Sequence, residues 1–350
     1  MKPAVKSEFR ATGPEDADRI AAFLVRVFRE EVGATFTQRA NLAWKYWTPR
    51  FDWKGSRSYV LERNGEIASH SGVWPLELRS ESKAWKVIHL IDWAAGEWEV
   101  GAGVVLLHRL AKMADMVLAI GGSNQTRRIM PSLGFRVVGN YQSFARPVRP
   151  FKQALAHQYR NWKLPARWLR NTAWSLFPRG GVSADWSAEP VFPEALDERA
   201  LPRTPAQLLL CTRKREWFAY LRDCPCARFE LLQLRKKGDV AGYISISFVP
   251  GIARIGDLWV QSDKLEDWTA AYRLATSLAA KPKDVFEVQA SSSFRLGTDA
   301  LIRAGYHRRE EAPVFLLDPK RNFPAGGEFS VQMIDYDEAF RRGDRPFFQT

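Results

Sequence analysis

The stretch VIHLIDWAAGEWEVGAGVVLLHRLAKMADMVLAIGGSNQTRRIMPSLGF, Val87–Phe135, decides the fold. Its first five residues, Val87–Ile91, are rich in residues that favour a strand, and the apolar spacing of Val104–Lys112 predicts a buried helix. Met116–Ile120 predicts a second strand, and Gly134 predicts a left-handed cap that ends the helix after it. The stretch therefore predicts a strand, a loop, a helix, a second strand and a short second helix.

Two glycines, Gly101 and Gly103, lie where the loop enters the first predicted helix. Glycine lets the backbone approach an anion closely, and the first turn of a helix offers N–H groups with about half a positive charge behind them. The sequence thus predicts a pyrophosphate site at Val100, Gly101, Ala102, Gly103 and Val104. An ordinary strand-to-helix turn also favours glycine, so the spacing alone leaves both interpretations open.

The whole stretch resembles the GNAT superfamily of acyl-CoA-dependent N-acyltransferases. Gly101 and Gly103 stand at the two glycine positions of the family's pyrophosphate loop, Asn124 at its asparagine beside the splayed strand, and Gly134-Phe135 at the pair that closes the next helix. The resemblance implies acetyl-CoA, or another acyl-CoA, as co-substrate, with no metal. It also implies that Asn124 belongs to the cofactor site.

The sequence departs from this family at two positions. Trp98 stands where the pyrophosphate loop usually begins with Gln or Arg. Met130 stands four residues before Gly134, where many relatives carry a tyrosine that protonates the leaving thiolate. The resemblance therefore supports the fold and the cofactor better than it supports the chemistry.

Segments of the two halves resemble each other at an offset of about 170 residues. Such an offset indicates two copies of one domain, and the mixture of hairpins with a crossover helix predicts an α/β fold with a mixed sheet in each copy, hence two GNAT-like domains in tandem. The matching segments are Asn64–Val73 with Lys237–Ile246, Leu90–Trp93 with Ile255–Trp259, and Pro131–Phe135 with Ile302–Tyr306.

The second copy lacks the glycine loop. Val260–Trp268 contains no glycine and several acids, which would repel a pyrophosphate, and Arg295 stands at the asparagine position. We therefore predict an acyl-CoA-binding domain at 1–148, a basic aromatic connector at 149–195 and a degenerate domain at 196–350.

Composition limits the class of protein. With 350 residues, 46% of them hydrophobic, the chain is long enough for two packed cores. Its three cysteines, Cys211, Cys224 and Cys226, have no matching histidine or cysteine cluster, which favours buried thiols over a zinc site and implies a reducing cytoplasm. No stretch has the length and apolarity of a signal peptide or a membrane span, and we expect a soluble protein.

A formal charge of +13 implies an anionic partner, and part of it is concentrated between the halves. Residues 146–179 hold eight Lys or Arg and no acid, interleaved with Phe151, Tyr159, Trp162, Trp168, Trp174 and Phe177. This composition is typical of an interfacial helix on an anionic membrane, which would put the protein on the inner membrane face. It also fits a nucleic-acid surface, which we expect less, or a solvated connector whose aromatics pack between domains.

Direct attack of an amine on a thioester needs a group that accepts a proton. The resemblance places such a group on the strand before the glycine loop, where His89 and Asp92 are the candidates. The alternative for His89 is core packing. The alternative for Asp92 is a carboxylate that caps neighbouring loop N–H groups, because Asp257 repeats it in the half without the glycine loop. Strand alternation puts His89 and Asp92 on opposite faces unless a bulge intervenes. Tyr141 is a candidate replacement for the missing acid, with core packing again the alternative.

These observations predict an N-acyltransferase that moves an acyl group from acyl-CoA to an amine. We expect this group to be acetyl. The tandem arrangement also resembles GNAT proteins of exopolysaccharide and cell-surface glycan synthesis, which implies an amino-sugar acceptor. Two alternatives stay open. One is a protein like the aminoacyl-tRNA-dependent peptidyltransferases of cell-wall synthesis, and the other is a tandem GNAT module that binds without turnover.

Overall fold

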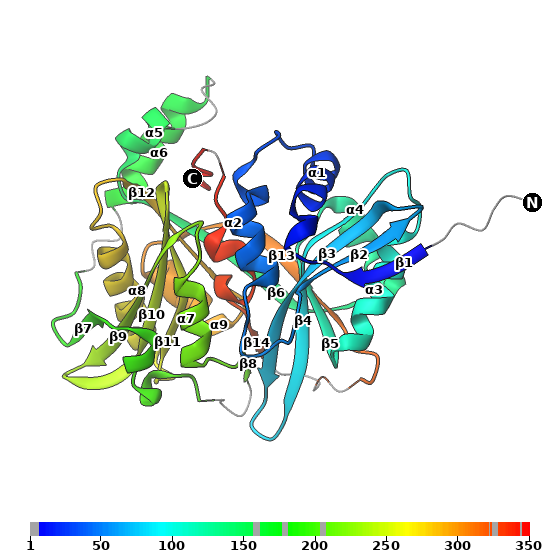
Figure 1. The fold of residues 1–350 in the computed structure, drawn as a ribbon. Coiled ribbons are helices and arrows are strands. Elements are labelled where there is room, and N and C mark those ends of the chain that lie inside the picture. The colour runs from blue at the N-terminus through cyan, green and yellow to red at the C-terminus, as the bar shows by residue number, and fades with distance from the viewer. Residues whose placement is uncertain are drawn as a thin grey trace, which may run out of the picture. The chain divides into compact units, whose positions relative to one another are not determined.

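The computed structural model describes residues 7–156, 162–176, 181–203, 208–321, 323, 328–343 and 345–350. The chain forms two compact units, and two of the places at which it passes from one to the other lie inside the strands β6 (Arg136–Pro147) and β13 (His307–Leu317) (Figure 1). Unit 1 consists of Met1–Leu78, Lys83–Val138 and Pro313–Gly326, and unit 2 of Arg79–Ser82, Gly139–Ala312 and Gly327–Thr350.

The sheet of unit 1 mixes antiparallel hairpins with one parallel pair. Its elements are β1 (Ser7–Ala11), α1 (Ala17–Phe28), α2 (Arg39–Leu42), β2 (Ser58–Arg63), β3 (Glu66–Arg79), β4 (Ala84–Ala95), α3 (Ala102–Leu110), β5 (Met116–Ile120) and α4 (Asn124–Ile129). The strand order is β1-β2-β3-β4-β5-β13. β4 and β5 are parallel, because α3 carries the chain back across the sheet, and β13 lies antiparallel to β5.

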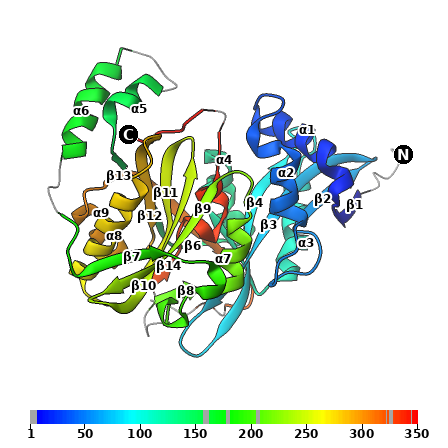
Figure 2. The ribbon, with the colours of Figure 1, turned by 60° about the vertical axis from the view of Figure 1, so that its left-hand side comes forward.

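Unit 2 repeats this arrangement. Its elements are α5 (Pro150–Ala156), α6 (Leu164–Leu176), β7 (Trp186–Pro190), β8 (Leu208–Cys211), α7 (Arg215–Arg222), β9 (Arg228–Lys236), β10 (Asp239–Val249), β11 (Gly251–Val260), α8 (Leu265–Ala279), β12 (Val285–Ser292), α9 (Arg295–Arg303) and β14 (Glu328–Ser330). The strand order is β6-β12-β11-β10-β9-β7, with β11 and β12 parallel. Helices α8 and α9 pack together against β11 and β12 (Figure 2).

The two units are copies of one fold, and the last strand of each unit's sheet comes from the other half of the chain. By their order, β1 to β5 correspond to β7, β9, β10, β11 and β12, and α3 and α4 correspond to α8 and α9. The strand that flanks β5 is β13, from the second half of the chain, whereas the strand that flanks β12 is β6, from the first half. The predicted mixed α/β fold with two tandem copies is confirmed, and the exchange is a feature that the sequence did not predict.

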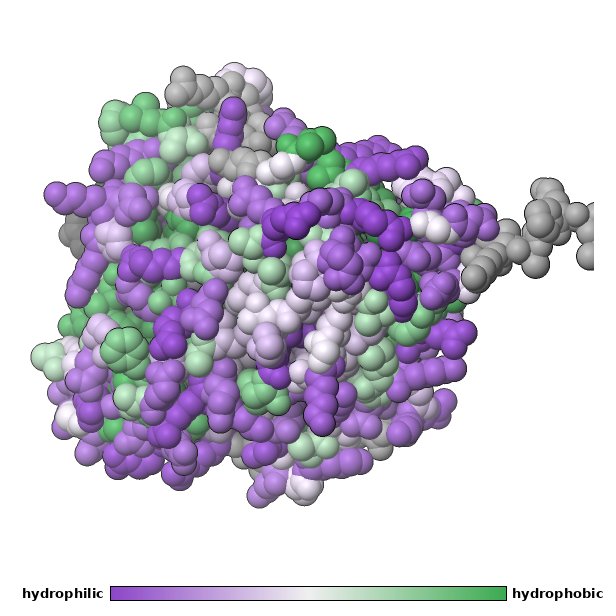
Figure 3. Space-filling model, viewed as in Figure 1, coloured by the Kyte–Doolittle hydropathy of each residue, from purple (hydrophilic) through white to green (hydrophobic). Residues whose placement is uncertain are grey.

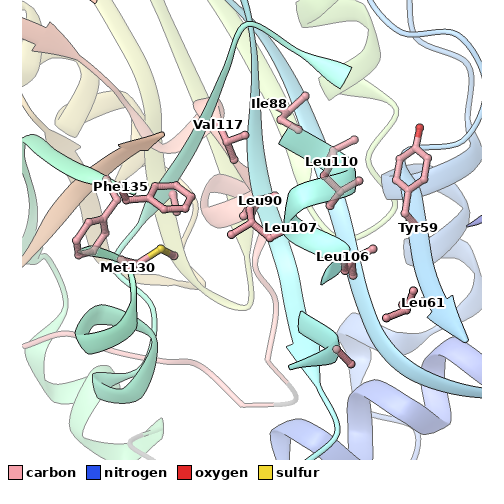
Figure 4. Packing of buried hydrophobic residues seen from close by; sticks show 14 of the residues in the cluster. Tyr59, Leu61, Ile88, Leu90, Leu106, Leu107, Leu110, Val117, Met130 and Phe135 are labelled. Carbon is pink, nitrogen blue, oxygen red and sulfur yellow. The ribbon is translucent and has the colours of Figure 1, made fainter. Parts of the chain in front are cut away.

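The core of unit 1 lies between α3 and the sheet. Leu106, Leu107 and Leu110 of α3 are fully buried against Ile88 and Val117 of the parallel strands (Figure 4). Burial of each such side chain is worth about 1.5–3 kcal/mol. This packing explains why the predicted helix forms: its apolar residues recur on the one face that meets the sheet.

The local predictions for Val87–Phe135 hold closely. β5 has the predicted bounds, Val87–Ile91 lies inside β4, and Gly134 ends the turn after α4 with φ +88°. Near the C-terminus, the last strand is short: β14 ends at Ser330, and a 3₁₀ turn follows at Met333–Asp335. Of the predicted connector aromatics, Tyr159 and Phe177 lie outside the described residues.

Candidate functional site

The parallel strands β4 and β5 pair over a short distance and then separate. The ladder joins Val87–His89 to Met116–Leu118, although β4 continues to Ala95 and β5 to Ile120. Ala119 and Ile120 pair with β13 on the other side of β5. The edge of β4 that faces β5 is therefore free of ladder hydrogen bonds to β5 from Leu90 onward.

The loop after β4 leads into α3 through a left-handed glycine. Gly101 has φ +81° and is the N-cap of α3, and a Cβ there would meet no atom within 4 Å. The amide of Val104 donates to Gly101 O over 3.1 Å, and that of Ala102 to Glu99 O over 3.1 Å. The amide of Gly103 lies in the first turn, where a helix provides no acceptor of its own.

Gly103 has a packing role in addition to any role toward an anion. A Cβ at this position would lie 3.2 Å from the Cβ of Ala95 and 3.6 Å from the indole nitrogen of Trp93. The same indole donates to Gly103 O over 3.3 Å. The glycine therefore allows α3 to approach the end of β4 closely. Val100, by contrast, is 90% exposed.

Arginines neutralise the acids of this loop. Glu97 pairs with Arg29 at 2.8 Å, and Glu99 pairs with Arg63 at 2.7 Å. Two carboxylates beside the α3 N-terminus would disfavour a phosphate, and these pairs reduce that repulsion.

Trp98, at the position where Gln or Arg was expected, fixes the loop against α1. The guanidinium of Arg26 lies 3.6 Å from the centroid of its ring, and Phe23 meets the same ring edge-on at 6.4 Å. Both partners come from one helix, so the loop is held on two adjacent turns of α1.

A bulge at Asp92 decides which face the candidate bases occupy. Ile88, Leu90 and Trp93 pack toward α3, which places the intervening His89 on the opposite face of the sheet. Ile91 and Asp92 both point toward Tyr46 on that opposite face, and Asp92 has φ +48°. His89 and Asp92 therefore lie on the same face.

The Asp92 carboxylate is bound by two side chains of the π-helix Ala43–Trp47. Lys45 Nζ and the Tyr46 hydroxyl each lie 2.6 Å from its Oδ2. Burial acts to raise the pKa of Asp92, but Lys45 and the two hydrogen bonds prevail and hold it below its ordinary value. Asp92 is therefore an ionised carboxylate at neutral pH.

A buried chain of hydrogen bonds ends on the backbone of the same residue. His70 Nδ1 lies 3.1 Å from Asp92 O, and its Nε2 lies 3.0 Å from Ser58 Oγ. Because a carbonyl oxygen can only accept, Nδ1 carries the proton and Nε2 accepts from Ser58, which in turn accepts from Thr12 over 2.8 Å. Burial lowers the pKa of His70 to about 4, which keeps the ring neutral.

The structure separates the other predicted site residues. His89 is 2% exposed, on the strand segment where the β4–β5 ladder ends. Asn124 is the exposed first residue of α4, whose N-cap is Ser123. Tyr141 lies in unit 2, where burial raises the pKa of its hydroxyl far above the ordinary value.

Met130 shows where the family tyrosine is replaced. Its side chain is 1% exposed and packs in the α3 core near Phe135 (Figure 4). A thioether cannot donate a proton, so this position supplies no acid.

The residue of unit 2 that corresponds to Asp92 is Asp257, which is fully committed to a buried network. Its Oδ2 accepts from Arg213 Nε and from the Tyr243 hydroxyl, each over 2.5 Å, and Arg213 also contacts Asp335 over 2.7 Å. Burial raises the pKa of Asp257, whereas Arg213 opposes that shift. The network is a structural one, because its members satisfy one another.

Sequence reasoning missed Lys45, Tyr46, Ser58 and Thr12. Nothing in the spacing of Trp44–Trp47 shows that a π-helix turns two consecutive polar groups, Lys45 and Tyr46, inward. A lysine enclosed by aromatic residues was the available signal.

No metal cluster forms among the described residues, and one hollow of unit 2 lies away from the predicted site residues. Within the described ranges, no group of three or more His, Cys, Asp and Glu side chains is placed to hold a metal ion. A hollow of about 540 Å³ lies in unit 2, between Cys226–Arg228, Phe248–Gly251 and Asp284–Phe286, and it contains none of the predicted site residues.

Known proteins resemble the chain in structure and not in sequence. No family model and no curated protein matches the sequence. The N-myristoyltransferase of Saccharomyces cerevisiae with bound myristoyl-CoA matches 91% of this chain and 79% of its own, at 11% identity and a TM-score of 0.61. A GCN5-related N-acetyltransferase from Anabaena variabilis matches 89% of this chain and 72% of its own, at 12% identity and 0.55. A GCN5-related N-acetyltransferase from Sphaerobacter thermophilus matches 91% of this chain and 98% of its own, at 16% identity and a TM-score of 0.50.

At these identities the likeness establishes architecture and not substrate. The matches cover about nine tenths of the chain, so they include both units. The chain has the tandem GNAT fold that N-myristoyltransferase also has.

Proposed function

We propose that the chain is an acyl-CoA-dependent N-acyltransferase whose unit 1 binds the thioester and passes its acyl group, acetyl, to an amine. The observation that carries the proposal is the end of the β4–β5 ladder at His89, on a strand that leads directly into the Gly101-capped N-terminus of α3. A separated strand pair next to a free helix N-terminus gives one molecule room for a linear arm and a site for its phosphates.

The cofactor would bind along β4. Its pyrophosphate would accept from the amides of Gly101 and Gly103, since the Ala102 amide already donates to Glu99 O. The exposed Val100 and the first turn at Val104 would border it. The arm would run beside β4 beyond His89, where a backbone N–H not used by β5 could donate to the thioester carbonyl. The solved N-myristoyltransferase with bound myristoyl-CoA supports a thioester ligand for this fold.

The transfer needs one proton acceptor and balances without an added reagent. The amine nitrogen forms a bond to the thioester carbon, the carbon–sulfur bond breaks, and the thiolate takes up a proton as the nitrogen loses one. His89 is our candidate acceptor, because it lies where the strands part. Asp92, ionised and paired with Lys45 on the same face, would shape the acceptor side of the strand.

A module that binds acyl-CoA without turnover is the second candidate. Two observations favour it: Met130 fills the place of the family's acid inside the core, and the Asp92 carboxylate already accepts from Lys45 and Tyr46. Binding and turnover must therefore be measured separately.

Calorimetric titration with acetyl-CoA and with CoA tests binding. Val100→Glu places a carboxylate at the α3 N-terminus without entering the core, and Val32→Glu is the matched control, because Val32 is 94% exposed elsewhere in unit 1. We expect Val100→Glu to weaken binding at least ten-fold and Val32→Glu to leave it unchanged. Equal binding by both variants would refute the pyrophosphate assignment.

Thiol release over a panel of amines, including amino sugars, then tests turnover. Binding without thiol release would establish the second candidate. A parallel titration with tRNA separates both from a tRNA-dependent transferase, which the charge of +13 also favours. Tight tRNA binding in the absence of acetyl-CoA binding would overturn our proposal.

A further inference from the structure

Helix α6 of unit 2 buries a polar residue and exposes apolar ones, which reverses the pattern of an ordinary surface helix. The residues at spacings of three and four along one face are exposed and apolar, with Leu169 62% and Leu176 58% exposed. Pro165, Trp168 and Ala173 complete this stripe. An isolated exposed leucine would need no explanation, whereas a continuous helical stripe does.

The buried positions of the same helix pair are polar. Asn171 is the buried residue of α6 and Gln153 that of α5, whereas Phe151 and Leu155 of α5 are 64% and 58% exposed. Both helices thus turn an amide inward and leave apolar side chains in water. Figure 3 shows hydrophobic residues over α5 and α6 at the upper left of the molecule.

The polar face fixes the pair to the body of unit 2. Asn171 Nδ2 donates to Gln153 Oε1 over 3.1 Å, and Gln153 Nε2 donates to the Glu287 carboxylate of β12 over 2.8 Å. Trp174 stacks on His307 with the ring centroids 3.8 Å apart. These contacts define which side of α6 faces inward, so the apolar stripe is presented outward by the fold itself.

Charge indicates which partner covers the stripe. Residues 146–176 contain no acid, and two exposed lysines belong to the helix pair: Lys152 lies in the first turn of α5, and Lys163 directly precedes α6. A second copy of the chain would bring the same cations together, and it carries the same net charge of +13. Aliphatic side chains such as Leu169 do not stack on bases, which disfavours RNA. An anionic bilayer suits both the apolar stripe and the lysines. Its acyl chains would contact the stripe, and its anionic headgroups would pair with the lysines.

We infer that the α5–α6 pair is a membrane-docking element that lays its apolar stripe into the interface of an anionic bilayer. No helix among the described residues is long and apolar enough to cross a bilayer. Attachment is therefore peripheral and combines shallow apolar insertion with electrostatic attraction, which makes it weaker as salt increases.

Co-sedimentation with vesicles tests the inference on the full chain. The vesicles are phosphatidylcholine alone or with 30% phosphatidylglycerol, at low and at high salt. The variants are Leu169→Gln/Leu176→Gln for the stripe and Lys152→Gln/Lys163→Gln for the charge. Phe192→Gln is the control, since Phe192 is a 72% exposed apolar residue elsewhere in unit 2.

We expect the parent to pellet with anionic vesicles at low salt. The leucine variant should partition at least ten-fold less, the lysine variant at least three-fold less, and the Phe192 control within two-fold of the parent. Absence of pelleting with anionic vesicles, or equal pelleting of the parent and the leucine variant, would overturn the inference. So would a parent dimer in sedimentation velocity that the leucine variant converts to monomer, or salt-sensitive binding of an oligonucleotide in place of vesicles.

Discussion

Lys45 Nζ lies 2.6 Å from the Asp92 carboxylate, and the two side chains retain 7% and 15% of their solvent exposure. A pair this enclosed is a unit, because removal of either member leaves the other charge without compensation. The pair is anchored on one side by the π-helix and on the other by the bulge of β4. The pair therefore fixes the shape of β4 beyond His89, and it also fixes the charges on the face of β4 that carries His89 and Asp92.

Asp92→Asn should reduce the free energy of unfolding by about 3 kcal/mol, because it leaves the Lys45 ammonium buried and unpaired. Urea denaturation measures this. Lys45→Met/Asp92→Asn should recover most of the loss, since it removes both charges. Because folding lowers the pKa of Asp92, this contribution is present above about pH 4 and disappears as the pH falls below that value. A single variant as stable as the parent would contradict this account.

His89→Ala should lower the turnover rate ten-fold or more while acetyl-CoA affinity is retained, if His89 accepts the proton at the strand separation. Steady-state thiol release and calorimetry on one preparation separate the two effects. The opposite pattern, an active His89→Ala beside a stable but inactive Asp92→Asn, would assign the role to the carboxylate.

His70 should make the protein less stable in mild acid. Its folded pKa of about 4 lies below the unfolded value near 6.5, so between these values the unfolded chain binds the additional proton and stability falls as the pH falls. The loss should approach about 3 kcal/mol at pH 4. His70→Gln should flatten the pH dependence of urea unfolding between pH 7.5 and 5, whereas His108→Gln, at an exposed position of α3, should preserve it.

Acetyl-CoA should bind with a stoichiometry of one per chain. Unit 2 lacks the glycine pair, and its Asp257 is enclosed by Arg213 and Tyr243. Arg213→Met should therefore lower stability by about 3–5 kcal/mol and leave the affinity for acetyl-CoA unchanged below the unfolding transition. A titration that fits two equal sites would contradict the assignment of a single site to unit 1.

The sequence predicted those parts of the fold that depend on local spacing. β5, α3 and the left-handed Gly134 follow from apolar periodicity and from the one residue type that favours positive φ. The relative facing of His89 and Asp92 was predicted only conditionally, because alternation along the strand does not show where a bulge interrupts it, as it does at Asp92 with φ +48°. Lys45 and Tyr46 were missed for the same reason: their role exists only across a distance of 46 or 47 residues.

The glycine loop illustrates a second limit. Its position as the N-cap of α3 was predictable, but the close packing of Gly103 on Ala95 and Trp93 was not, because it depends on the angle at which α3 approaches β4. A bulky residue at Gly103 would therefore disturb the core as well as any anion, which is why Val100 is the better position for a test.

The exchange of β6 and β13 also constrains how the protein is made. During synthesis the first unit cannot close its sheet until β13, which begins at His307, has left the ribosome, because that strand is the one that covers the open side of β5. Until then the nascent chain carries an unpaired strand edge of the kind that recruits chaperones or aggregates. A gene cut between the two copies would consequently yield fragments that are each missing a strand, and co-expression of both pieces would be needed for either to become soluble.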